Sequence, residues 1–156
     1  HSEINILGSL NVAFTDIDEY KNIYVAFYCQ NRIEKFDQSG KLLIKISKEL
    51  PFEIIYDMRK QVYEFQGNKS QLMMPYLTQV FDNIFIDSKN RLWALAHIRD
   101  PETNELIRKQ FDIYDEDGVW LTSVPDVEEM HLLHIHNESA FFRDENFVVY
   151  EYIISG

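Results

Sequence analysis

Two stretches decide the fold of this chain: NIYVA (residues 22–26) followed by NRIEKFDQSGKLL (residues 31–43), and NRLWAL (residues 90–95) followed by FDIYDEDGVWL (residues 111–121). Each reads as strand, turn, strand, acidic turn closed by glycine, and strand. Gly40 and Gly118 can take the positive φ angle that closes a tight hairpin. A layout that occurs more than once predicts a fold built from repeated structural units that stack on one another.

Extended outward, this layout divides a single domain of residues 1–156 into three blade-like units, at 10–49, 80–125 and 126–156. Four strands are predicted in each of the first two units. The third has three candidate strands, the last at 147–154, and lacks a fourth. Consecutive four-stranded antiparallel meanders of about 40 residues are typical of β-propeller blades.

Residues 50–79 interrupt the pattern and are interpreted as a long connection, with two short strands or one poor helix at 53–65. Aromatic and methionine side chains gather in it: Tyr56, Tyr63, Met73, Met74 and Tyr76. If the segment crosses one face of the molecule, these side chains predict an adaptable binding surface. The alternative is a loop that buries them against the blades.

Composition limits the classes of partner. The chain is 46% hydrophobic and 14% aromatic, which is typical of a globular protein. Its formal net charge of −11 disfavours binding to nucleic acid or to an anionic membrane surface. No apolar run approaches the length of a membrane span.

The single cysteine, Cys29, excludes an intrachain disulfide and lies in an apolar context that predicts a buried, inert thiol. The best metal candidate is the run HLLHIH (residues 131–136). On a strand His134 and His136 share a face, close enough to hold one ion. A third ligand would have to come from another unit, for example from His97 or an aspartate. Ordinary strand histidines are the competing interpretation.

A second motif, Asp112, Asp115, Asp117 and Gly118, partly resembles a calcium loop. The distal bidentate glutamate of such loops is missing. A hairpin turn explains residues 115–118 completely. We therefore interpret them as a turn.

The quoted motifs resemble those of NHL-type six-bladed β-propellers, in which an Ile/Leu-Tyr-Val strand is followed by an Asn-Arg-Ile segment and an Asp-x-x-Gly turn. Residues 22–43 match this phrase well, whereas the second unit loses the Asn-Arg-Ile element in its enlarged loop at 99–105. The later units and the connection before them resemble the C-terminal half of bacterial six-bladed propeller proteins of unassigned function. The resemblance implies an all-β chain forming half of a six-bladed propeller, and possible export from the cell.

The motifs that carry this resemblance are structural turns and core strands, so they imply a fold and neither a catalytic residue nor a cofactor. A half ring would expose blade faces and strand edges. We therefore expect the chain to self-associate, two copies completing a ring as a homodimer, or to join a missing N-terminal half. The leading expectation for function is a non-catalytic scaffold that binds a protein or small ligand. The alternative is a propeller lyase or hydrolase with a channel metal held partly by His134 and His136.

Overall fold

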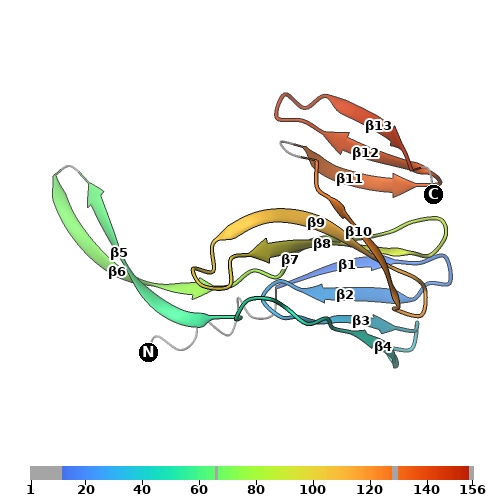
Figure 1. The fold of residues 1–156 in the computed structure, drawn as a ribbon, viewed down its shortest axis with the longest axis horizontal. Helices are drawn as coiled ribbons and strands as arrows, with labels where there is room; N and C mark the ends of the chain where they lie inside the picture. The colour runs from blue at the N-terminus through green and yellow to red at the C-terminus, as the bar shows by residue number, and fades with distance from the viewer. Residues whose placement is uncertain (1–11, 66, 128–129, 155–156) are drawn as a thin grey trace.

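The computed structural model describes residues 12–65, 67–127 and 130–154. These residues form thirteen strands in four antiparallel sheets and no helix (Figure 1), which confirms the predicted all-β class. Among them, therefore, no helix is long and apolar enough to cross a membrane.

The first sheet is the meander β1 (Ala13–Ile17), β2 (Ile23–Phe27), β3 (Ile33–Phe36) and β4 (Leu42–Ile46), in that order. Its residues alternate between two faces, as strands require. On β2, Tyr24 and Ala26 are fully buried, whereas Ile23 on the opposite face is exposed. The buried face meets the neighbouring sheet.

The second four-stranded meander is β7 (Phe81–Ile86), β8 (Leu92–Arg99), β9 (Leu106–Tyr114) and β10 (Trp120–Pro125). Its interior strand β8 is buried on both faces, with Leu92 and Ala94 on one and Trp93 on the other. This sheet is covered on both sides, which explains the continuous apolar run in its sequence.

The last sheet contains β11 (His131–His136), β12 (Ser139–Arg143) and β13 (Val149–Ile153). We expected the last of these strands to begin at residue 147. It begins two residues later, because Phe147 adopts a φ of 64° and closes the turn. Among the described residues, the outer strand β13 pairs only with β12.

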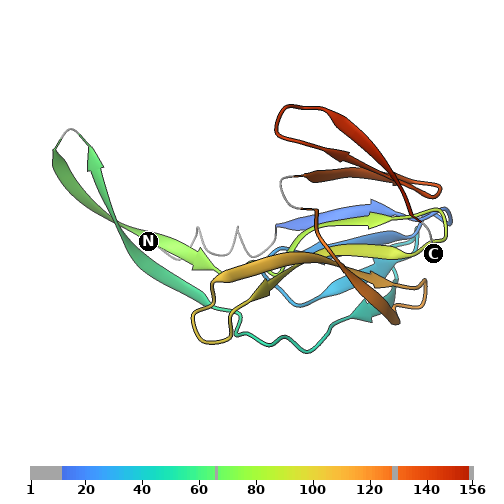
Figure 2. The ribbon, with the colours of Figure 1, turned by 45° about the horizontal axis from the view of Figure 1, so that its top comes forward.

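The connection between the two meanders differs most from expectation. In place of two short strands or a helix, β5 (Tyr56–Phe65) and β6 (Asn68–Leu77) form one hairpin of ten-residue strands, closed near Gly67 at a φ of 77°. The hairpin projects away from the other sheets (Figures 1 and 2). It is therefore not a loop draped over the body.

Five hairpin turns share one hydrogen-bond pattern. Each begins with an aspartate whose Oδ1 accepts the N–H of the fifth residue, and the fourth residue has a positive φ. The aspartates are Asp18, Asp37, Asp87, Asp115 and Asp144, and the fourth residues are Lys21, Gly40, Asn90, Gly118 and Phe147. The aspartate side chain thus satisfies a backbone donor that the turn would otherwise leave unpaired.

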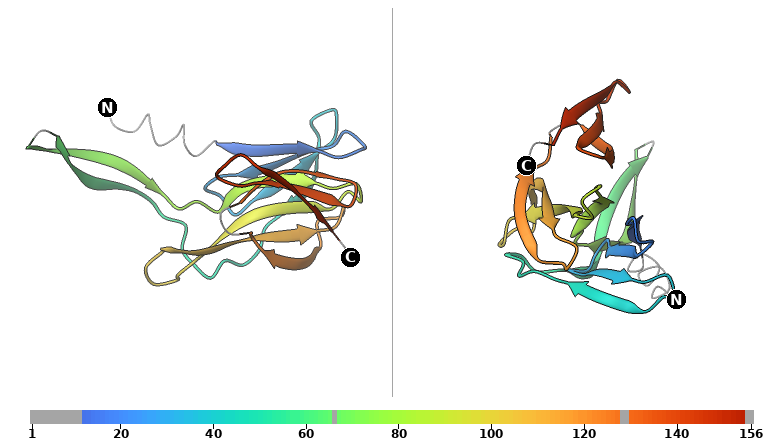
Figure 3. Two further views of the ribbon diagram at one scale, coloured as in Figure 1. Left: turned by 90° about the horizontal axis from the view of Figure 1, so that it is seen from above. Right: turned by 90° about the vertical axis from the view of Figure 1, so that its right-hand side faces the viewer.

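Two apolar cores lie between successive sheets. The first joins the β1–β4 sheet to the second meander through side chains such as Tyr24, Ile33, Ile84 and Leu92. The second joins that meander to the β11–β13 sheet through Trp93, Phe111, Ile135, Phe142 and their neighbours. Seen end on, the three sheets follow one another along an arc (Figure 3).

Polar contacts also run from sheet to sheet. Asp16 accepts the N–H of Ile86 at 2.7 Å, linking the first strands of two meanders. The β7–β8 turn then reaches the β11–β12 turn, where Ser88 donates to the carbonyl of Asn137 at 2.9 Å. Lys48, just beyond β4, forms an ion pair with the fully buried Asp112 of β9. Polar contacts therefore link the first meander to the second and the second to the β11–β13 sheet.

Candidate binding site

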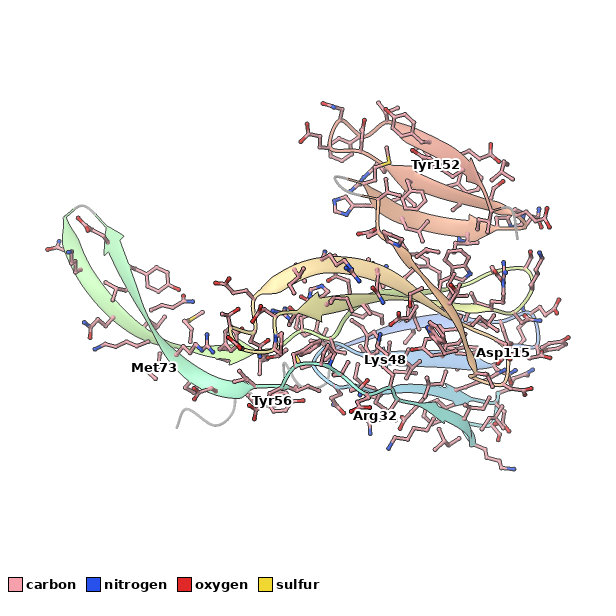
Figure 4. All side chains as sticks on the ribbon, in the orientation of Figure 1. Arg32, Lys48, Tyr56, Met73, Asp115 and Tyr152 are labelled. Atoms are coloured by element: carbon pink, nitrogen blue, oxygen red, sulfur yellow. The ribbon has the colours of Figure 1, made fainter. Side chains whose placement is uncertain are left out.

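The β5–β6 hairpin carries all five residues predicted to form a binding surface. Figure 4 shows Tyr56 at its root and Met73 farther out along the ribbon. The exposed fractions of Tyr56, Tyr63 and Met73 are 46%, 45% and 52%. Met74 and Tyr76 are partly buried.

The strand register divides these five residues between two faces. Opposed residues of an antiparallel pair share a face, and successive residues alternate. Because Lys60 pairs with Met73 and Tyr56 with Leu77, Tyr56 and Met73 lie on one face. Tyr63, Met74 and Tyr76 lie on the other. The segment therefore offers two apolar faces instead of the single patch we expected.

Hydrogen bonds fix the root of the hairpin. The N–H of Thr78 donates to the carbonyl of Ile55 at 3.0 Å, and Thr78 Oγ1 accepts the N–H of Ile55 at 3.0 Å. Asn104, in the β8–β9 loop, donates to the same hydroxyl at 3.1 Å. The Tyr56 hydroxyl donates to the carbonyl of Cys29. The arm is thus held to the body at its base.

The two predicted metal-binding histidines do lie side by side. The rings of His134 and His136 stack with their centroids 6.0 Å apart, and both residues are exposed on β11. His97, the suggested third ligand, is buried beside Asp82. Over residues 12–65, 67–127 and 130–154 there is no group of three or more His, Cys, Asp or Glu residues able to hold a metal ion.

In the motif that partly resembles a calcium loop, the carboxylates of Asp112 and Asp115 accept hydrogen bonds from nearby residues. Asp115 Oδ1 accepts the N–H groups of Asp117 and Val119, at 3.1 and 2.8 Å, within its own turn. The buried Asp112 accepts hydrogen bonds from Gln110 and Ser123 and pairs with Lys48. These contacts support the interpretation of residues 115–118 as a hairpin turn.

A cleft of about 1080 Å³ lies between the β7–β10 and β11–β13 sheets. Its apolar lining includes Phe85, Leu95, Ile107, Met130 and Leu132. Its polar lining includes the titratable side chains Asp82, Arg108, Lys109, Asp126, His131, Arg143 and Glu145. A volume of this size, with apolar walls and a few polar groups, suits a small organic ligand.

Asp82 is the most strongly perturbed acid in the cleft. It pairs with Lys109 and accepts a hydrogen bond from Gln79, and its Oδ2 lies 3.1 Å from Nε2 of His97. Burial alone would raise the pKa of Asp82, but the contacts with His97 and Lys109 outweigh burial and lower it to about 2. Asp82 is therefore ionised at neutral pH.

Asp126, in the same cleft, shows the opposite shift. Its partial burial raises the pKa, and the N–H of Val127, which donates at 2.9 Å, offsets this only in part. Two carboxyl groups of one cleft thus have pKa values displaced in opposite directions, an arrangement often found at functional sites.

Sequence reasoning missed this cleft for a definite reason. Its residues come from β7, β8, β9, β11 and the segments around them, so no local motif carries them. One signal was available: Asp82 and His97 are polar residues on largely apolar strands, and Lys109 lies on a strand of mixed apolar and polar residues. Such positions need partners, and here they partner one another.

Comparison of the chain with protein-family models and with curated proteins gives no match.

Proposed function

We propose that this chain is a non-catalytic binding scaffold built from three blades of an NHL-type six-bladed β-propeller. The cleft between the β7–β10 and β11–β13 sheets carries the functional part of this proposal, because its size and mixed lining suit a small ligand. Hydrogen bonds from Ile86 to Asp16 and from Ser88 to Asn137 link successive sheets. These links support an arrangement in which the sheets follow one another as propeller blades do.

A three-blade unit needs a complement, since propellers typically close with 4–8 blades. The outer face of the β1–β4 sheet supports this requirement: Ile17, Ile23 and Leu42 are 55%, 38% and 46% exposed. A second copy that completes the ring, or a missing N-terminal half, would cover this face. Light scattering at about 50 μM should give twice the chain mass of 18.6 kDa. A mass of one chain would contradict completion by a second copy.

The cleft can be tested with an anionic amphiphile, 8-anilinonaphthalene-1-sulfonate, as the probe. We expect its fluorescence to rise on titration with the folded protein, because the cleft offers apolar walls beside Lys109 and Arg108. Ile107→Ser combined with Arg108→Ala should weaken binding several-fold, about 1 kcal/mol for one lost apolar contact and one lost charge.

Ile153→Ser is the matched control for the probe, since Ile153 is 70% exposed on β13 and does not line the cleft. It removes an exposed apolar side chain elsewhere and should leave the titration unchanged. Equal weakening by both variants would mean that the probe reports general surface hydrophobicity, and the cleft would lose its support as a ligand site.

The second candidate function is a lyase or hydrolase with a channel metal, and the stacked rings of His134 and His136 favour it. Elemental analysis after dialysis separates the two functions. A transition metal bound in a 1:1 ratio and lost in the His134→Ala/His136→Ala variant would favour the enzyme. Metal content below this ratio in both proteins would favour the scaffold.

A further inference from the structure

The β5–β6 hairpin presents exposed apolar side chains on both of its faces. By the strand register, Val62 and Met73 lie on one face, with 58% and 52% of their surface exposed. Tyr63 and Leu72 lie on the opposite face, at 45% and 54%. A two-stranded ribbon on its own is only marginally stable in water. Covering both faces would therefore stabilise it.

The charge of the hairpin differs from that of the rest of the chain. Residues 56–77 contain three basic side chains, Arg59, Lys60 and Lys69, and two acidic ones, Asp57 and Glu64. Of the 15 basic and 26 acidic residues in the chain, 12 and 24 therefore lie outside the hairpin. A slightly basic arm on a strongly acidic body is electrostatically complementary to the body of a second identical chain.

The hairpin is also long enough to contact a second molecule. Its strands are ten residues long, which corresponds to about 33 Å of extended chain. Hydrogen bonds between Ile55 and Thr78 close its root, and Asn104 of the β8–β9 loop donates to Thr78 Oγ1 at 3.1 Å, which holds the root to the body. Figures 1 and 3 show the ribbon extending well beyond the other sheets, where another molecule can cover both of its faces.

We propose that the β5–β6 hairpin is an arm that clasps a second copy of this chain. In a two-fold dimer each arm lies against the acidic body of the other copy with one face and against the other arm with the second face. Such an arrangement is self-complementary, as a two-fold interface requires. This inference rests on the proposed self-association and adds to it the segment that holds the copies together.

The test uses the full chain with Leu72→Ser and Met73→Ser together, because these neighbours point to opposite faces. Sedimentation equilibrium should show a dimer for the unchanged protein and a dissociation constant at least about tenfold higher for the variant, a loss of about 1.4 kcal/mol or more. Ser70→Ala with Gln71→Ala changes polar residues on the same two faces and should leave the dissociation constant unchanged.

A hairpin-less variant gives a second, independent measurement. Ile55 and Thr78 already bond to each other, so two glycines can replace residues 56–77 without displacing the ends. We expect this variant to fold, as judged by circular dichroism, and to sediment as a monomer.

Two outcomes overturn the inference, and they are distinguishable. A monomeric unchanged protein would overturn both the self-association and the arm. A dimer that survives removal of the hairpin, but is lost when Ile17→Lys and Ile23→Lys charge the outer face of the first sheet, would overturn the arm alone. In that case completion of the ring would be retained.

Discussion

His97 Nε2 lies 3.1 Å from Oδ2 of Asp82, at the edge of the cleft between two sheets. The other ring nitrogen, Nδ1, lies 3.2 Å from Nη2 of Arg99. An arginine can only donate a hydrogen bond, so Nδ1 is the acceptor in this contact. Arg99 and Asp82 thus each face one ring nitrogen of His97.

The first prediction concerns acid stability. Because the pKa of Asp82 is about 2 in the folded chain and higher in the unfolded chain, its contribution to stability is present above pH about 4 and lost as pH falls toward 2. We expect Asp82 to account for about 2 kcal/mol of the loss in unfolding free energy over this interval. Urea unfolding at several pH values measures it. In Asp82→Asn the fall in unfolding free energy between pH about 4 and pH about 2 should be smaller by that amount. A pH profile identical to that of the unchanged protein would contradict a lowered pKa for Asp82.

For Asp126 we expect the contribution to stability to depend on pH in the opposite direction. Its pKa is raised in the folded chain, so its contribution to stability declines as pH rises through the interval between its unfolded and folded values. Asp126→Asn removes the ionisation of a partly buried group while keeping its shape. Its free energy of unfolding at neutral pH should therefore exceed that of the unchanged protein. A lower value would show that the ionised carboxylate has a stabilising partner.

Gly118 and Gly40 form a matched pair for a test of packing. Both close Asp-first turns, at φ values of 79° and 82°. A Cβ on Gly118 would lie 2.9 Å from Cγ1 of Ile46, whereas a Cβ on Gly40 would meet no atom of the described residues within 4 Å. Gly40→Ala should cost about 1 kcal/mol for the backbone alone, and Gly118→Ala about 2–4 kcal/mol because it also crowds the neighbouring sheet. Equal losses in chemical denaturation would contradict the close approach of the two sheets.

The single thiol provides a probe of unfolding. Cys29 is fully buried, and burial raises its pKa to about 11. The thiolate is the reactive form, so alkylation by iodoacetamide at pH about 8 should be slow in the folded protein and fast in urea. Mass spectrometry over time measures both rates. Similar rates in the two conditions would show that the β2–β3 turn opens readily.

Local sequence patterns were enough to predict most of the strands and turns of the sheets. The apolar run at Ile23–Phe27 and the turns at residues 37–40 and 115–118 act over a few residues, so their outcome depends little on distant parts of the chain. The hairpin at 56–77 was harder, because Pro75 and the mixed apolar pattern suit a loop as well as a ribbon. Pro75 is tolerated there since each strand of a two-stranded hairpin has a free edge.

The candidate site was only partly accessible from sequence. Tyr56, Tyr63 and Met73 were singled out because aromatic and methionine side chains favour binding surfaces, but their division between two faces depends on the register of β5 against β6. The cleft depends on how two whole sheets are placed. Asp82 and Asp126 meet there only after β7 and β10 have formed, so no spacing in the sequence marks them.

The sequential order of the sheets bears on how the chain is made. Every described strand pairs only with strands next to it in the sequence. Each meander can therefore close within a few tens of residues, soon after that stretch leaves the ribosome, without waiting for the C-terminal part of the chain. The contacts between sheets would form afterwards, so synthesis adds one ready-made sheet after another to those already assembled.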